Sequence, residues 1–495
     1  MEKPLLCLLN LLLCFPQFYG RSLRPSKVYG TADGSEEWGY VEVRPKAHVF
    51  WWLYRSPQRV ENSSSPWPTV LWLQGGPGAS GVGIGNFQEV GPLDTNLKPR
   101  DSTWLQRADL LFVASIKEKR GKNFFLMLSD RISYELKLQD NPVGTGYSYV
   151  ENTSSLVKTD EESASDLTIL LKKLYNGNER LQKSPLYAVA ESYGGKFAVT
   201  LGLSVVKAIK AGQLNLTFGG IALGDTWISP EDFVLSWGPL LKDVSRLDIN
   251  GEEQSNSLAK VIQKQIAEGK YKEATDSWSQ LEGVISENSN SVDFYNFLLD
   301  AAMDPLGMTS AVSTATAVAT LSSVKMTMRS YSRYLSSKAV STVSLDDLMN
   351  GVIKHKLKII PKNVSWGGQS DLVFTSLESD FMKPRINEVD ELLSMGVNVT
   401  IYSGQVDLIC ATKGTEAWIQ KLKWKGLQNF NNAKREPIYC ENEIVTRGFF
   451  KSYSNLHFYW ILEAGHFVPV DQPCVALRML SETTQSPART SAASS

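Results

Sequence analysis

The sequence predicts an α/β fold with a mostly parallel central sheet, and two observations support this. Short runs of β-branched, aromatic and other apolar residues recur along the chain and end in glycine-containing turns. Continuous apolar runs of this kind are typical of strands buried on both faces of a parallel sheet. Between two of these runs, residues 160–175 place four leucines on one face of a helix. Buried strands that alternate with amphipathic helices favour α/β layers.

Seven segments are predicted as strands, at residues 49–54, 69–73, 110–113, 186–190, 220–223, 397–402 and 458–462. The chain from 230 to 350 has few such runs and carries helical patterns, for example at 257–285. We therefore predict a helical cap insertion at 230–350. It separates two parts of the core, at 21–229 and 351–482. A tail at 483–495 has little to pack and is expected to be disordered.

The charge balance excludes some classes of protein. The 495 residues include 51 Lys and Arg against 52 Asp and Glu, which gives a formal net charge of −1. Near-neutrality argues against a nucleic-acid-binding protein, which needs a concentrated basic face, and against a polybasic membrane binder. Only four histidines are present, which argues against a multi-histidine metal cage. We expect no metal and no organic cofactor.

The first twenty residues resemble an export signal. Lys3 precedes an apolar run at 5–15, which only Asn10 interrupts. This run is too short to span a bilayer, which takes about twenty residues of helix, but it suits a signal peptide. We expect residues 1–20 to be a signal peptide and the mature protein to have no membrane span. The expected location is secreted, with lysosomal as the alternative.

Cysteines and glycosylation sequons add weaker evidence for export. If Cys7 and Cys14 belong to the signal, Cys410, Cys440 and Cys474 remain and allow one disulfide at most. The pairing of Cys410 with Cys440 is the more local choice, and the sequence leaves it open. Five Asn-x-Ser/Thr sequons are candidate glycosylation sites, at Asn62, Asn152, Asn215, Asn363 and Asn398.

Two glycine-rich turns follow predicted strands and suggest acyl-transfer chemistry. Ser192 comes just after the strand at 186–190, between Ala190 and Gly194. A serine with a small residue two positions away on each side is typical of a nucleophile elbow, although an ordinary strand-to-helix turn gives the same pattern. Residues 74–78 follow the strand at 69–73. Glycines there let backbone N–H groups approach a developing oxyanion, and a tight structural turn is the alternative.

An acid and a histidine follow two later strands. Asp407 lies in the turn after 397–402, and His466 follows 458–462. The chain order Ser, Asp, His is that of the α/β-hydrolases and differs from the orders in chymotrypsin and subtilisin. The other three histidines lack such a strand-end context. Ser192, Asp407 and His466 are therefore the predicted catalytic residues, on an α/β-hydrolase fold.

Four motifs together resemble those of the serine carboxypeptidase family. They are WLQGGPG at 72–78, DNPVGTGYS at 140–148, ESYGG at 191–195 and GHFVP at 465–469. The resemblance covers nearly the whole mature chain. It implies that Ser192 is the acylated nucleophile, that His466 is its general base and that Asp407 orients His466. It also implies a substrate class, the C-termini of peptides or proteins, with removal of the terminal residue.

The resemblance also implies binding roles for four further residues. The backbone N–H groups of Gly76 and Tyr193 are expected to form an oxyanion hole. Glu191 and Gln74 are expected to bind the terminal carboxylate of the substrate. A glutamate beside a carboxylate must share a proton with it, because two ionised groups repel each other, and this predicts activity at acidic pH.

Three departures from the family pattern leave questions. Gln74 replaces the usual asparagine, Ala79 stands where many relatives have a disulfide cysteine, and residues 114–139 are an insertion at a strand end. We interpret the insertion as a splice variant or a gene-model error, with a functional loop as the alternative. An esterase or acyltransferase on the same scaffold, or a binding or protective protein with little or no catalysis, also fits the sequence. A homodimer stays open.

Overall fold

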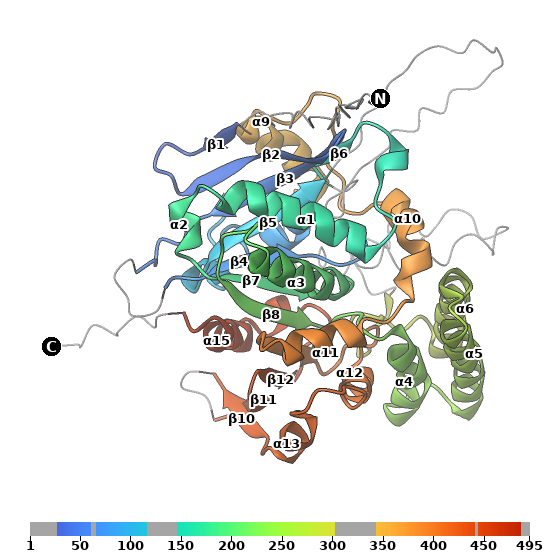
Figure 1. Ribbon diagram of the computed structural model, residues 1–495. Coiled ribbons are helices and arrows are strands. Elements are labelled where there is room, and N and C mark those ends of the chain that lie inside the picture. Colours follow the sequence, from blue (N-terminus) through green and yellow to red (C-terminus); the bar gives the residue numbers. More distant parts are fainter. Residues whose placement is uncertain (1–26, 61–65, 116–145, 302–342, 441–443, 487–495) are drawn as a thin grey trace, which may run out of the picture.

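The computed structural model describes residues 27–60, 66–115, 146–301, 343–440 and 444–486 (Figure 1). A single 12-stranded sheet runs through the molecule in the order β1-β2-β3-β5-β4-β7-β8-β9-β12-β11-β10, and β6 pairs with β3. The predicted signal at 1–20, most of the insertion at 114–139 and the segment 302–342 of the predicted cap lie outside the described residues.

The six central strands of the sheet are parallel. They are β5 (Asp109–Ser115), β4 (Thr69–Leu73), β7 (Leu186–Glu191), β8 (Phe218–Gly224), β9 (Val399–Gly404) and β12 (Leu456–Ile461). All five residues of β4 and all six of β7 and β9 are buried, in agreement with the largely apolar sequences of these strands. The carboxyl ends of these strands meet at one edge of the sheet, and every predicted catalytic or substrate-binding residue follows one of these strands or, in the case of Glu191, ends one.

Antiparallel strands flank this centre. One edge is formed by β1 (Val28–Gly30), β2 (Glu36–Arg44), β3 (Ala47–Tyr54) and β6 (Tyr149–Val150), and the other by β11 (Thr446–Tyr453) and β10 (Glu436–Tyr439). The sequence predicted only β3 among these. The others are short or are partly exposed with charged residues, so they lack the continuous apolar pattern.

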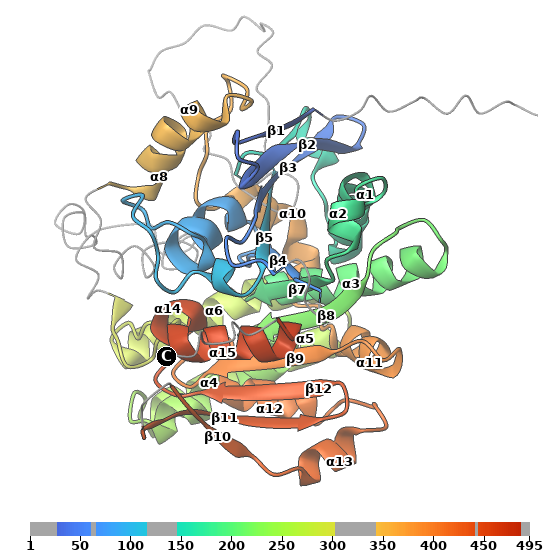
Figure 2. The same ribbon diagram turned by 90° about the vertical axis from the view of Figure 1, so that its left-hand side faces the viewer.

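Helices cover both faces of the sheet (Figure 2). One face carries α1 (Asp160–Tyr175), α3 (Gly194–Lys210) and α11 (Ile386–Ser394), and the other carries η1 (Gly81–Val90), α14 (Val468–Asp471) and α15 (Pro473–Thr484). Shorter helices in the connections are η2 (Trp104–Gln106), η3 (Thr153–Ser155), α2 (Glu179–Gln182), α8 (Leu345–Leu348), η5 (Met349–Ile353), α9 (Lys354–Leu357), α12 (Thr412–Ile419) and α13 (Leu427–Asn432).

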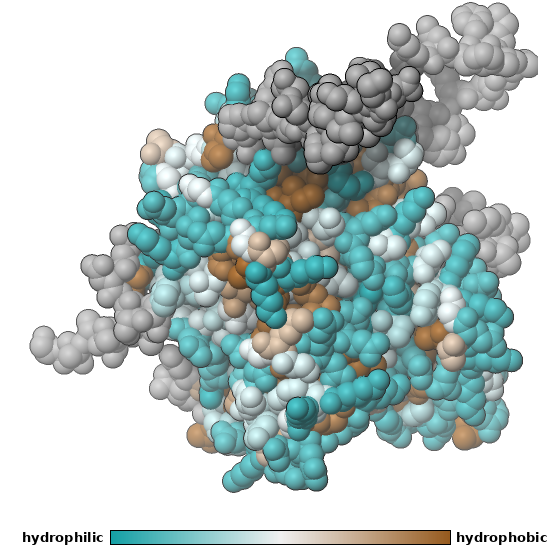
Figure 3. Space-filling view, viewed as in Figure 1, coloured by the Kyte–Doolittle hydropathy of each residue, from teal (hydrophilic) through white to brown (hydrophobic). Residues whose placement is uncertain are grey.

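Helix α1 has the bounds that its sequence predicts. The Thr159 hydroxyl accepts a hydrogen bond from the Glu162 N–H (3.2 Å) and so caps the helix start, where three acidic residues favour the helix dipole. The predicted leucine face is buried, and the opposite side carries charged residues. The face of the molecule that includes α1 is accordingly mainly hydrophilic, with apolar residues in scattered patches (Figure 3).

The described part of the predicted cap at 230–350 is mainly helical. It contains α4 (Pro230–Asp243), α5 (Ile249–Ala267) and α6 (Tyr271–Ser289), which lie together next to α10 (Asp371–Phe381) and α12 (Figure 1). The helical pattern predicted at 257–285 is split between α5 and α6, because Gly269 at φ +72° ends the first helix.

Two further predictions need correction. The disulfide joins Cys440 to Cys474, with a Cα–Cα distance of 6.0 Å, and Cys410 is a buried free thiol. Sequence separation favoured the wrong pair, because the structure places Cys440, which directly follows β10, next to Cys474 in the first turn of α15, whereas Cys410 lies in the loop between β9 and α12. The tail also begins later than predicted, since α15 continues to Thr484. In the described part of the chain, no helix has the length and apolar character needed to cross a bilayer.

Candidate active site

Ser192 occupies a sharp turn between β7 and α3. Its φ of +60° is rarely adopted by a residue with a side chain, and its N–H donates to the Gly224 carbonyl (3.1 Å). A Cβ atom on Gly194 would lie 2.2 Å from the Leu73 carbonyl oxygen, and one on Gly75 would lie 2.4 Å from the Ser192 Cβ. The turn after β4 therefore packs directly against the serine, which is the geometry expected of a nucleophile elbow.

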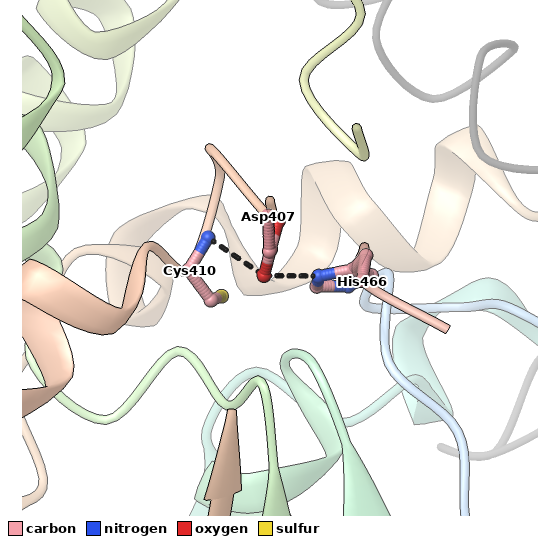
Figure 4. Close-up of side chains that lie close together, drawn as sticks. All are labelled: Asp407, Cys410 and His466. Atoms are coloured by element: carbon pink, nitrogen blue, oxygen red, sulfur yellow. Dashed lines mark hydrogen bonds and ion pairs between the residues drawn. The ribbon is translucent and has the colours of Figure 1, made fainter. Parts of the chain in front are cut away.

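Asp407 and His466 form a buried hydrogen-bonded pair (Figure 4). His466 Nδ1 lies 2.8 Å from Asp407 Oδ2, and the Cys410 N–H donates to the same oxygen (3.3 Å). Both side chains are fully buried. They meet because β9 and β12 are parallel neighbours, so the loops after these strands lie side by side.

The segment that follows α6 forms hydrogen bonds with both of these loops. His466 N–H donates to the Tyr295 carbonyl, Ile409 N–H donates to the Phe294 carbonyl and Phe297 N–H donates to the Val406 carbonyl, each at 2.9 Å. Sequence reasoning gave this segment no role at the site. These hydrogen bonds form because the chain returns from the helical insertion to the sheet edge, and no local sequence pattern predicts that path.

A small cavity of about 20 Å³ brings the predicted nucleophile and oxyanion residues together. It is lined by Gly76, Ser192, Tyr193, Trp227, Trp278, Tyr295, Gln369, Phe381, Ile409 and Cys410. Cys410 connects the cavity to the acid–histidine pair, because its Sγ, a carboxylate oxygen of Asp407 and a ring nitrogen of His466 lie within 4.8 Å of one another. Trp278 comes from α6 and Phe381 ends α10, so helices outside the sheet contribute the apolar wall.

Burial changes the acid–base properties of the pair. Removal from water lowers the pKa of His466 to about 4, although the charges of Asp225, Glu89 and Asp293 raise it in part. The imidazole therefore stays neutral, and able to accept a proton, well into acid. Burial raises the pKa of Asp407, while hydrogen bonds from the Cys410 N–H and from Asp225 lower it.

Gln74 and Glu191 are linked, and they include a third residue that the sequence analysis missed. Gln74 Nε2 lies 2.8 Å from Glu191 Oε1 and 3.0 Å from Glu89 Oε1, and its Oε1 accepts from the Trp72 indole (2.6 Å). Glu89 and Glu191 also share a hydrogen bond, and burial raises the pKa of Glu89 to about 7. The sequence did hold a signal, because Glu89 is the single charged residue between positions 75 and 93.

A buried ionic cluster lies behind the elbow. The Tyr193 hydroxyl donates to Asp160 Oδ1 (2.8 Å), and Lys196 Nζ lies 3.5 Å from Asp160 Oδ2. Arg385 contacts both Asp160 and Asp380 at 2.8–2.9 Å, and all of these side chains are at most 5% exposed. The cluster therefore holds Tyr193, the residue next to Ser192, in place through the Tyr193 side chain.

The grouping of Asp407, Cys410 and His466 does not suit a metal ion. Burial raises the pKa of the Cys410 thiol well above its usual value, so without a cation the thiol keeps its proton. His466 Nδ1 and Asp407 Oδ2 are also engaged with each other. A cation would have to displace that hydrogen bond.

The parallel sheet, the elbow serine and the buried acid–histidine pair define an α/β-hydrolase. Comparison with known proteins then specifies the family: the model described as serine carboxypeptidase matches residues 25–116 and 138–486. The chain belongs to the serine carboxypeptidase family and is a serine-type carboxypeptidase, a hydrolase. The match omits residues 117–137, inside the predicted insertion at 114–139.

Curated relatives match over nearly the full length. "Serine carboxypeptidase-like 51" of Arabidopsis thaliana is 59% identical over 92% of this chain and 93% of that protein. "Retinoid-inducible serine carboxypeptidase" of Rattus norvegicus is 45% identical over 97% of this chain and 98% of that protein. Among solved structures, the Kex1 prohormone-processing carboxypeptidase of Saccharomyces cerevisiae has a TM-score of 0.68, with 19% identity and 91% of each chain covered. This last similarity supports the fold.

Proposed function

We propose that the enzyme removes C-terminal residues from peptides through an acyl-enzyme on Ser192. The observation that carries this proposal is the Asp407–His466 hydrogen bond beside a cavity that Ser192 lines. With Nδ1 donating to Asp407, Nε2 is the nitrogen of neutral His466 that carries the lone pair. It takes the Ser192 proton as Oγ attacks the carbonyl carbon, and it returns a proton to the leaving amine. Water then hydrolyses the ester by the same steps.

The backbone N–H groups of Gly76 and Tyr193 form the oxyanion hole in this proposal. Both residues line the cavity with Ser192. Gly76 has φ +108°, a conformation that strongly favours glycine, and Tyr193 is anchored through its hydroxyl to Asp160. Two rigidly placed donors stabilise the charge that develops on the substrate oxygen without reorganising as the reaction proceeds.

Gln74, Glu191 and Glu89 bind the terminal carboxylate of the substrate. One amide group holds two buried glutamates close together, so an incoming carboxylate is accepted only when protons are shared among the acids. With a pKa of about 7, Glu89 carries a proton below neutrality and can donate it in a hydrogen bond to the substrate. Above pH 7 its negative charge repels the carboxylate. Neutral His466 sets the lower limit, so the favourable range lies between about pH 4 and pH 7.

We also propose that the protein is an exported glycoprotein, secreted or lysosomal. A disulfide between Cys440 and Cys474 suits an oxidising compartment. The sequons at Asn152, Asn215 and Asn363 have exposed asparagines. Asn398 is the weakest candidate, because it is half-buried and its Nδ2 donates to the Gly219 carbonyl (3.2 Å). Asn62 lies outside the described residues. A mass shift on enzymatic deglycosylation that is smaller by one glycan in the Asn215→Gln variant tests one of these sites.

Two measurements test the catalytic proposal. Fluorophosphonate labels an activated serine, so labelling of the signal-cleaved protein separates an enzyme from a binding or protective protein. Ser192→Ala removes the label and lowers kcat roughly 10⁴-fold or more, because the members of a triad act as a unit. Label on another serine contradicts the assignment.

Mass analysis of a peptide incubated with the enzyme gives the reaction type. Stepwise loss of residues from the C-terminus is expected. Hydrolysis of ester substrates with intact peptides would favour the esterase or acyltransferase alternative. The Thr415→Ala variant, in a buried position on α12 outside the cavity lining, serves as a control for expression and handling.

A further inference from the structure

A second carboxyl group lies behind the Asp407–His466 pair. Asp225 directly follows β8, it is 1% exposed, and its N–H donates to the Tyr402 carbonyl (3.0 Å). Its φ of +43° lies in the left-handed region, which among residues with a side chain is adopted most readily by asparagine and aspartate. Strained backbone of this kind often marks residues that the surrounding structure holds for a function.

The Asp225 carboxyl group is held in one orientation. Its Oδ1 accepts hydrogen bonds from the Gly404 N–H (2.8 Å) and from the Ser403 hydroxyl (3.1 Å). These donors end β9, three or four residues before Asp407. Asp225 is therefore fixed to the same strand end that positions the acid of the proposed triad.

One oxygen of each carboxyl group accepts no hydrogen bond from a donor group in the described part of the chain. These oxygens are Asp225 Oδ2 and Asp407 Oδ1, and both are buried. The other oxygens are engaged, with Gly404 and Ser403 on Asp225 and with His466 and Cys410 on Asp407. The two carboxyl groups are themselves in hydrogen-bonding contact.

A shared proton accounts for this arrangement. Two ionised carboxylates in contact and away from water repel each other strongly, so such a pair keeps one proton. Burial raises the pKa of both carboxyl groups, but the hydrogen bond from Asp225 lowers the pKa of Asp407, whereas the charge of Asp407 raises the pKa of Asp225 further. The proton therefore belongs on Asp225. The other ionisable groups that interact with the pair are His466, Asp293, Tyr295, Cys410 and Tyr402.

We propose that Asp225 is a positioning residue, whose protonated carboxyl group donates a hydrogen bond from Oδ2 to Asp407 Oδ1. This hydrogen bond fixes the plane of the Asp407 carboxylate and so the ring of His466. The proposal rests on the proposed roles of Ser192, Asp407 and His466. It goes beyond them by adding a fourth side chain, one that never touches the substrate.

Two substitutions at Asp225 test this role. Asp225→Ala removes the donor and is expected to lower kcat about 10- to 100-fold, the effect of one hydrogen bond to a charged group, with KM unchanged. Asp225→Asn places an amide donor at the same atom, keeps the acceptor for Gly404 and tolerates positive φ, so it is expected to recover most of the lost kcat. The fluorophosphonate labelling rate should follow kcat in both variants. Wild-type kcat in a folded Asp225→Ala, or an equal loss in Asp225→Asn, overturns the proposal.

A direct measurement covers the case in which Asp225→Ala does not fold. In wild-type protein labelled with carbon-13 at the aspartate carboxyl groups, we expect an NMR signal from a protonated carboxyl at pH 7 that is missing in Asp225→Asn. If no such signal disappears, the proposal is wrong. This readout does not depend on catalysis. Failure of the Ser192 assignment would instead appear as persistent labelling of Ser192→Ala.

Discussion

Arg385 is the side chain whose loss we expect to destabilise this fold most clearly. Its guanidinium group donates to Asp160 (Nε, 2.9 Å), Asp380 (2.9 Å), Glu161 (2.6 and 3.1 Å) and Glu388 (2.9 Å), and the side chain is 1% exposed. These contacts join the start of α1 to the segment between α10 and α11. Through Asp160 they also reach the Tyr193 hydroxyl beside Ser192.

Arg385→Met keeps the apolar volume and removes the charge. The fully buried part of the cluster then contains two carboxylates, Asp160 and Asp380, with Lys196 as the remaining buried cation. Lys383 also lies 3.8 Å from Asp380, but it is partly exposed. Breaking a buried ion pair by removal of one partner typically costs about 3–5 kcal/mol, because a charge is left uncompensated. We expect a loss in the free energy of unfolding of at least this size.

Urea unfolding followed by tryptophan fluorescence measures the effect as a lower midpoint at unchanged slope. Arg478→Met is the matched control. Arg478 pairs with Glu482 at 2.8 Å on α15, but both side chains are well exposed, so the loss should stay below about 1 kcal/mol. Equal midpoints for the two variants would refute the reasoning.

The pH dependence of the Arg385→Met deficit provides a second check. Burial raises the pKa of Asp160 from 3.8 to about 6 in the folded wild-type protein. Loss of the arginine raises it further, so the folded variant binds protons at a higher pH than the unfolded chain. Its stability must then increase as the pH falls through this range. The deficit relative to wild type is therefore expected to shrink as the pH falls toward 6, where Asp160 of the wild-type protein also takes up a proton, and a constant deficit from pH 8 to pH 6 would contradict this account.

Two further predictions concern pH. A free-acid peptide should be trimmed best below neutrality, whereas its C-terminal amide should keep its rate at higher pH. The Glu89→Gln variant should extend trimming of the free acid above pH 7. Superimposable pH–rate profiles for acid and amide would exclude a role of Glu89 and Glu191 in binding the carboxylate. Because the pKa of His466 is about 4 in the folded state and near 6.5 when unfolded, the unfolded state gains a proton first as the pH falls from 6.5 to 4, which destabilises the folded state by about 3 kcal/mol. His466→Gln should lose correspondingly less stability over this range in urea titrations, and an identical loss would count against the low pKa.

Local patterns in the sequence were enough to predict the centre of the fold and the principal candidate residues. Helix α1 has the predicted bounds because its cap, its acidic first turn and its leucine face all lie within one segment. The strands before Gln74, Ser192, Asp407 and His466 were found because strands buried on both faces are apolar throughout. In a parallel sheet, residues that follow such strands share one edge, so strand identity alone predicts that they meet. The strands β2, β10 and β11 were missed, because half-exposed strands mix polar and apolar residues.

Contacts between distant segments were decided by the tertiary structure. Cys474 rather than Cys410 reaches Cys440, Glu89 joins Gln74 and Glu191, and Asp225 meets Asp407. Each of these contacts depends on the order of strands in the sheet or on the course of the segment that connects two elements. Neither property produces a periodic pattern in the sequence. The same holds for the buried charges around Arg385. A charged residue in the sequence is usually at the surface, and only the packing of α1, α3 and the segment between α10 and α11 shows that these lie inside.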